Sequence, residues 1–274
     1  MKRALLAALG AGAILVAGVV PHAQPSRKRI LAWADVRYGY QHDSISHAIA
    51  TIERLGRESG AYDTFIRTDS QLITKHPISL APGTQKATGE GTFNLHNLDY
   101  FDAIFFFGVR EIELSPEQRA DLLAFIRDDG KGLVVAHSGL TAFFSWPEFG
   151  DMVGARFDEH PWNIIDGTVV VDDTRHPAMR HLPARSVFHD ELYQLKDFSR
   201  DKIHVLAHLD SAKLDRTNPL VHRKDADFPA AWTRQYGKGR VFASILGHAA
   251  ENWDNPLLQQ MYLQAIRWSL HQVE

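Results

Sequence analysis

Histidines follow several apolar runs of this sequence, close to the points where buried strands would end. His137 and His248 lie just behind two such runs, and His42 lies in the polar segment behind a third. Imidazole binds divalent metals and also moves protons near neutral pH. These three side chains are therefore the first candidates for chemistry, and we expect them to be metal ligands.

Two short segments add carboxylates to this set. Their sequences are Asp158-Glu159-His160-Pro161-Trp162 and His189-Asp190-Glu191-Leu192-Tyr193. Imidazole and carboxylate groups together hold zinc, manganese or nickel, or serve as acid and base on a sugar. We expect Glu191, Asp190 and His160 to be the catalytic groups. The sequence has no His-Glu-x-x-His motif and no cysteine pair, so the metal prediction depends on these loops converging.

Other residues near the predicted strand ends could contact a substrate. We expect this role for Tyr40, Arg110, Ser138, Trp162 and Tyr193, because aromatic rings stack on sugars and polar groups bond to hydroxyls. Ser138 also leaves open a serine hydrolase, since it follows a predicted strand. The Gly-x-Ser-x-Gly elbow that exposes such a nucleophile is absent around it, which favours a capping or hydrogen-bonding role.

These candidates need a scaffold that brings strand ends together. Apolar and amphipathic segments alternate along the chain, which predicts an α/β fold with a doubly wound, mostly parallel sheet flanked by helices. We expect strands at 29–34, 102–107 and 132–136, helices at 44–55 and 256–272, and a C-terminal hairpin at 230–246 that completes the sheet. Ligands bind outside the carboxyl ends of strands in such sheets, where the candidate loops lie.

One segment has no periodic pattern of apolar residues. Residues 68–98 are rich in Gly, Pro, Thr and polar residues, and we expect a long loop there that could cover the site.

Composition narrows the function classes. The chain has 274 residues, 45% of them hydrophobic, and its net charge of −3 provides no basic field for nucleic acid. It has no cysteine, so thiol catalysis and thiolate metal sites are excluded. We expect no nucleotide cofactor. A homo-oligomer is compatible with this composition.

The N-terminal residues have the order of a secretory signal. Lys2 and Arg3 precede an uncharged run over 4–20, which ends close to Ala23. We therefore expect a signal peptide at 1–23, one domain over 29–274, and export to the periplasm or the extracellular space. An uncleaved membrane anchor is the alternative, whereas cleavage would leave no stable membrane insertion.

Four segments of the sequence resemble the ThuA-like (trehalose utilisation) family. They are Gly39-Tyr40-Gln41-His42-Asp43-Ser44, the segment 130–138, Asp190-Glu191-Leu192-Tyr193, and the segment 237–248. The resemblance implies a class I glutamine amidotransferase-like, flavodoxin-like fold, in which His137 stands where a nucleophilic cysteine would be. Glutaminase chemistry is thus excluded. The family pattern implies His42, His137, His160, Glu191 and His248 as pocket residues, with a divalent metal among them.

The resemblance also implies carbohydrate metabolism, because family members occur with oxidoreductases and hydrolases proposed to process 3-keto sugars. We expect an enzyme acting on a small carbohydrate, either a glycoside or a 3-keto-sugar, by hydrolysis, elimination or isomerisation. A non-catalytic sugar-binding module is the alternative, and a serine hydrolase using Ser138 is a weaker one. The sequence does not identify the sugar or the bond acted on.

Overall fold

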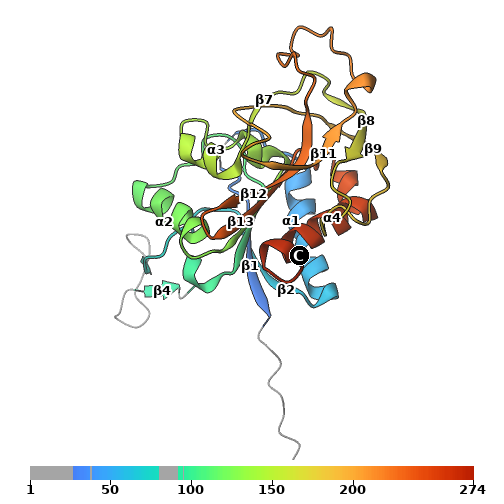
Figure 1. Ribbon diagram of the computed structural model, residues 1–274. Helices are drawn as coiled ribbons and strands as arrows, with labels where there is room; N and C mark the ends of the chain where they lie inside the picture. Colours follow the sequence, from blue (N-terminus) through green and yellow to red (C-terminus); the bar gives the residue numbers. More distant parts are fainter. Residues whose placement is uncertain (1–26, 38, 80–91, 95) are drawn as a thin grey trace, which may run out of the picture.

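A nine-stranded sheet forms the centre of the protein (Figure 1), with the strand order β2-β1-β5-β6-β13-β12-β11-β8-β9. The computed structural model describes residues 27–37, 39–79, 92–94 and 96–274. The predicted signal peptide at 1–23 lies outside these residues. No helix in the described ranges is long and apolar enough to cross a membrane.

One half of the sheet is parallel. It consists of β1 (Lys28–Trp33), β2 (Tyr62–Arg67), β5 (Ala103–Phe106), β6 (Gly132–Ala136) and β13 (Gly239–Ser244). Every residue of β5 and β6 is buried, because helices cover both faces of the sheet there. This explains why these strands have continuous apolar sequences. The α/β fold and its parallel sheet are therefore confirmed.

The other half is antiparallel. It consists of β12 (Pro229–Tyr236), β11 (His204–Leu209), β8 (Ile164–Val171) and β9 (Arg185–Glu191). The predicted hairpin is the pair β12 and β13, and β11, β8 and β9 extend the sheet beyond it. Side chains of β9 alternate between exposed and buried, as expected for an edge strand with one face in water.

Helices pack on the two faces of the sheet. The helices α1 (Ser44–Ser59) and α4 (Pro256–Ser269) contact each other on one face. The helices α2 (Pro116–Arg127) and α3 (Pro147–Val153) contact β13 from the other face (Figure 1). A capping box begins α2: Ser115 accepts from the Gln118 amide, and the Gln118 side chain accepts from the Ser115 amide.

Short elements complete the fold. Two small sheets pair β7 (Arg156–Glu159) with β10 (Gln194–Lys196), and β3 (Ile78–Ser79) with β4 (Thr92–Asn94). Four 3₁₀ helices are η1 (Leu98–Tyr100), η2 (His137–Thr141), η3 (Ser211–Lys213) and η4 (Ala250–Asp254). The pair β3 and β4 lies within the expected loop 68–98, of which 80–91 and 95 fall outside the described residues.

The order of the parallel strands creates a crevice. Because β1 lies between β2 and β5, the chain leaves β1 toward one neighbour and later returns on its other side. The loops at the carboxyl ends of β1 and β5 therefore diverge, which opens the sheet for a ligand. The loops that follow β1, β6 and β13 carry the three candidate histidines.

Candidate functional site

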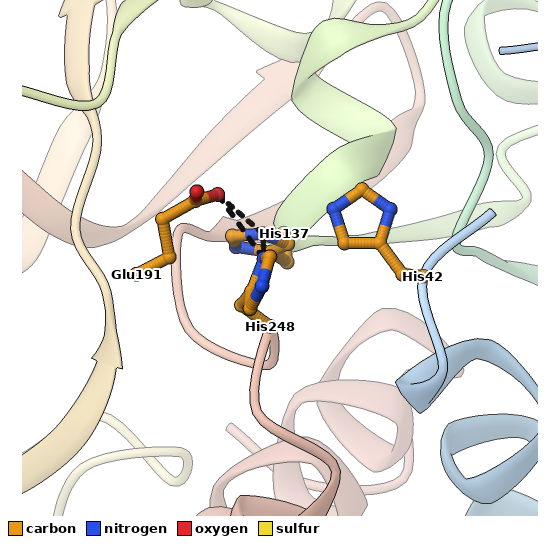
Figure 2. A group of neighbouring side chains, drawn as sticks. All are labelled: His42, His137, Glu191 and His248. Atoms are coloured by element: carbon orange, nitrogen blue, oxygen red, sulfur yellow. Dashed lines mark hydrogen bonds and ion pairs between the residues drawn. The ribbon is translucent and has the colours of Figure 1, made fainter. Parts of the chain in front are cut away.

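Three histidines and one glutamate converge at the carboxyl end of the sheet (Figure 2). Each of His42, His137, Glu191 and His248 offers one ligand atom, and these atoms all lie within 4.8 Å of one another. His42 precedes α1, His137 follows β6 directly, and His248 follows β13. Glu191 is the last residue of β9, the edge strand of the antiparallel half of the sheet.

The backbone at the end of β6 fixes His137. Its φ of 38° lies in the left-handed region, and its side chain is fully buried. Nδ1 lies 2.6 Å from the carbonyl oxygen of Ile245. Since a carbonyl only accepts, Nδ1 carries the proton and Nε2 presents a lone pair. The Tyr193 hydroxyl donates to this Nε2 over 2.7 Å. Such a backbone contact behind a ring orients histidines that bind metals.

Glu191 joins two of the histidines. Its Oε2 lies 3.1 Å from His248 Nδ1 and 3.4 Å from His137 Nε2. Burial alone would raise the pKa of Glu191, but the contacts with His137 and His248 outweigh it and hold the pKa well below its ordinary value. Burial alone would lower the pKa of His248, and the hydrogen bond with Glu191 raises it instead. Glu191 is therefore ionised at neutral pH.

His42 completes the cluster. Its Nδ1 is buried and has no hydrogen-bond partner within the described chain. Its ring stands nearly perpendicular to those of His137 and His248, with centroids 5.3 Å and 4.9 Å away. Burial and these two histidines lower the pKa of His42 to about 3. His42 is therefore neutral at pH 7, as a metal ligand must be.

The lone pairs of the cluster suit a cation. His248 Nδ1 lies 3.1 Å from both His137 Nε2 and Glu191 Oε2, and its one proton can serve only one of them. The Tyr193 hydroxyl already donates to His137 Nε2, which leaves the His248 proton for Glu191. A cation between these atoms would replace these two protons as the partner of both acceptors, and imidazoles with an ionised carboxylate are ligands that zinc and related ions accept. The donor set therefore fits a divalent metal.

Asp190 fastens the loop of His248 to the end of β9. Its Oδ2 accepts from the Gly247 amide over 2.6 Å, and its Oδ1 accepts from the Ala249 and Glu191 amides over 3.0 Å and 3.1 Å. Burial raises the pKa of Asp190, and the three amide donors act in the opposite direction. Its side chain is fully buried and does not line the cavity described next, so the structure gives Asp190 a positioning role.

A cavity of about 600 Å³, called the main cavity below, opens beside the cluster. Among the residues expected to be functional, those that line it are Tyr40, His42, Arg110, His160, Glu191, Tyr193 and His248. His160 is about two-fifths exposed, and its Nδ1 lies 3.9 Å from Glu191 Oε1. Imidazole, carboxylate and aromatic groups thus share one space.

Two expected substrate contacts lie elsewhere. The indole of Trp162 donates to the carbonyl of Asp215 over 2.9 Å and packs on Phe228, so the side chain belongs to the core. Ser138 is fully buried, and its Oγ has no partner within the described chain. It lies outside the lining of the main cavity.

Several residues that line the main cavity were not predicted from the sequence, among them Phe144, Phe157 and Lys196. Phe157 lies in β7 and Lys196 lies in β10. The sequences of these two short strands do not indicate that they pair with each other. The 143–146 turn is held by Arg156, whose guanidinium donates to three carbonyls of that turn. The segment 158–162, with its imidazole and carboxylate groups, was the only sequence feature that indicated this part of the main cavity.

Comparison with known proteins agrees with the fold. A ThuA-like protein from Bacteroides uniformis is 21% identical with a TM-score of 0.65, over 91% of this chain and 94% of that chain. A ThuA-like protein from Parabacteroides merdae is 15% identical with a TM-score of 0.61, over 89% and 90%. None of the curated proteins matches this chain. Residues 29–269 match the ThuA family, described as trehalose utilisation, and the chain therefore belongs to that family.

Proposed function

We propose that this protein is an exported enzyme that processes a glycoside or a 3-keto-sugar at a metal site. The observation that carries the proposal is the cluster of His42, His137, Glu191 and His248, whose ligand atoms lie within 4.8 Å of one another beside the main cavity. Membership of a family linked to trehalose utilisation supports a carbohydrate substrate.

The four residues of the cluster would hold the metal. A divalent ion there would polarise a hydroxyl or carbonyl oxygen of the sugar. The chain holds these ligands in place through Asp190, which ties the His248 loop to Glu191, and through the carbonyl of Ile245, which orients His137. In the sequence-based prediction Glu191 is a catalytic group, whereas its contacts with His137 and His248 support a role as the fourth ligand.

His160 is the group we assign to proton transfer. It lines the main cavity. The two carboxylates that were also considered for this role have other partners: Asp190 accepts from backbone amides, and Glu191 contacts histidines. A keto group acidifies the neighbouring C–H bond, so one base within reach of that carbon is what the chain must supply. His160 lines the main cavity with its Nδ1 3.9 Å from Glu191 Oε1, which supports this role.

Aromatic side chains would bind the sugar ring. Tyr40, Phe144 and Phe157 line the main cavity, and the faces of such rings stack on the C–H groups of sugars. The carbohydrate deacetylase Agd3 has a similar fold, with a TM-score of 0.51 at 14% identity, and 90% of this chain matches 32% of that one. Together with the family description, this supports a carbohydrate ligand.

Turnover of keto-glycosides tests the proposal. Metal-loaded protein is incubated with 3-keto-trehalose and with 3-keto methyl glucoside, and released products are followed by mass spectrometry. We expect product from wild type and a loss of at least about a hundredfold in His160→Asn, the range for removal of a general base. His47→Ala, which removes an imidazole outside the main cavity, is the matched control. Binding of sugars with no product from any of them would favour the sugar-binding module instead.

A further inference from the structure

A second cavity lies on the other side of the histidine cluster. It has a volume of about 320 Å³, and its lining includes Asp43, Ile164, His189 and Glu251. Tyr40, His42 and His248 line both this cavity and the main one, so these three side chains form a common wall. The cluster therefore does not lie at the bottom of one blind pocket but between two spaces.

Tyr40 is the most exposed of the three residues in this wall. The rings of His42 and His248 lie 4.9 Å apart between centroids, which leaves no passage for a sugar between them. Tyr40 packs edge-on against His42 with centroids 4.9 Å apart, and it is 62% exposed. A ligand that occupies both spaces would therefore cross over Tyr40, whose exposed ring offers a face for stacking.

The second cavity suits a hydroxyl-rich ring. Ile164 is 44% exposed and provides an apolar surface, while Glu251 and His189 provide polar groups. The Nδ1 of His189 is held by Asp166 over 2.7 Å, which leaves Nε2 for another partner. A sugar ring has an apolar face and polar edges. Ile164 matches the apolar face, and Glu251 and His189 match the polar edges. The carboxylates of Asp43 and Glu251 disfavour an anionic unit at this place.

We propose that the second cavity is a subsite for a second sugar unit, so that the substrate is a neutral disaccharide or larger glycoside that spans the cluster. This inference rests on the proposed function and specifies its substrate class. A unit bound in each cavity would place the glycosidic linkage over Tyr40, next to His42 and His248. The bond or carbon acted on would then lie at the centre of the ligand and not at its end.

Matched ligand pairs test the subsite. Trehalose and methyl α-D-glucoside share one ring and its linkage but differ in the second ring, and cellobiose and methyl β-D-glucoside form the same comparison for the other anomer. Binding to the metal-loaded protein is measured by calorimetry. We expect at least one disaccharide to bind about tenfold tighter than its methyl glycoside, since the second ring adds stacking and hydrogen bonds.

Variants of residues that line the second cavity test whether the tighter binding of the disaccharide arises there. Glu251→Gln and His189→Gln should each weaken disaccharide binding by about threefold to tenfold, the effect of one hydrogen bond, and change methyl glycoside binding less than about twofold. Tyr40→Ala should also weaken the disaccharide more than the methyl glycoside. His47→Ala lines neither cavity and should change neither ligand. The melting temperature of each variant verifies that it folds.

The outcomes separate this inference from the proposed function. Equal binding of both members of each pair, or equal losses for both in the variants, would overturn the subsite and leave the carbohydrate enzyme standing. Absence of binding by all four ligands would also overturn the subsite, whereas the proposed function stands or falls on the separate turnover of the keto-glycosides.

Discussion

Replacement of Asp190 by asparagine should loosen the loop that carries His248. The native carboxylate accepts three amide hydrogens, from Gly247, Ala249 and Glu191. An asparagine has one acceptor oxygen, so its amide nitrogen would face at least one of these donors. The contact with Gly247 is the shortest at 2.6 Å and tolerates a second donor least.

The magnitude follows from the lost hydrogen bonds. A buried amide left without an acceptor costs about 1–3 kcal/mol, so Asp190→Asn should lower the free energy of unfolding by that amount. For a domain of this size that is a fall in melting temperature of roughly 2–12 °C. Because Asp190 accepts from the backbone amides of Glu191 and of both neighbours of His248, metal affinity should fall about 10–100-fold, as for residues that orient ligands.

Two assays check this reasoning. Thermal unfolding of the metal-free protein measures stability, and competition with a chromophoric chelator measures metal affinity. Asp172→Asn is the matched control, because Asp172 accepts from His208 far from the cavity residues and should leave metal affinity unchanged. Wild-type melting temperature together with wild-type affinity in Asp190→Asn would refute the positioning role.

Three further predictions concern other parts of the chain. Ser138→Ala should leave turnover of keto-glycosides within about twofold of wild type and should not lower the melting temperature, because the buried hydroxyl has no partner among the residues that the structure describes. A large loss of turnover would instead favour the serine hydrolase. His176 has a pKa lowered by burial to about 4, so the folded chain binds fewer protons than the unfolded chain between pH 6.5 and 4. Stability should therefore fall as pH falls through that window, and His176→Asn should flatten the dependence in unfolding curves at several pH values; an unchanged slope would contradict the assignment. Expression with the native N-terminus should yield a mature protein in the periplasm that begins after Ala23 by mass spectrometry, whereas a full-length mass would favour the uncleaved anchor.

The loops of the site could be predicted from sequence because the topology of α/β sheets fixes where strands end. His137 and His248 follow buried strands that pair in parallel, so their meeting follows from the register of β6 and β13. The strand pattern alone did not predict that Glu191 contacts His137 and His248, because β9 is an edge strand and is far from β6 in the strand order of the sheet.

Side-chain direction was the other limit of sequence reasoning. Asp190 and Glu191 are neighbours in one strand, so their side chains point to opposite sides. Sequence alone could not tell which side faces the main cavity, and both were expected to be catalytic. Trp162 was expected to be a loop aromatic that contacts substrate, but its side chain is buried and its indole donates to the carbonyl of Asp215. Such long-range partners depend on packing that no short segment encodes.

Metal content measured by elemental analysis tests the central claim most directly. The mature protein, purified without a histidine tag, is loaded with zinc, manganese or nickel and then desalted. We predict about one equivalent of one of these metals in wild type and in His47→Ala, and almost none in His137→Ala, His248→Ala and Glu191→Gln. Absence of bound metal in wild type, or full occupancy in the three cluster variants, would contradict the assignment of this cluster as a metal site.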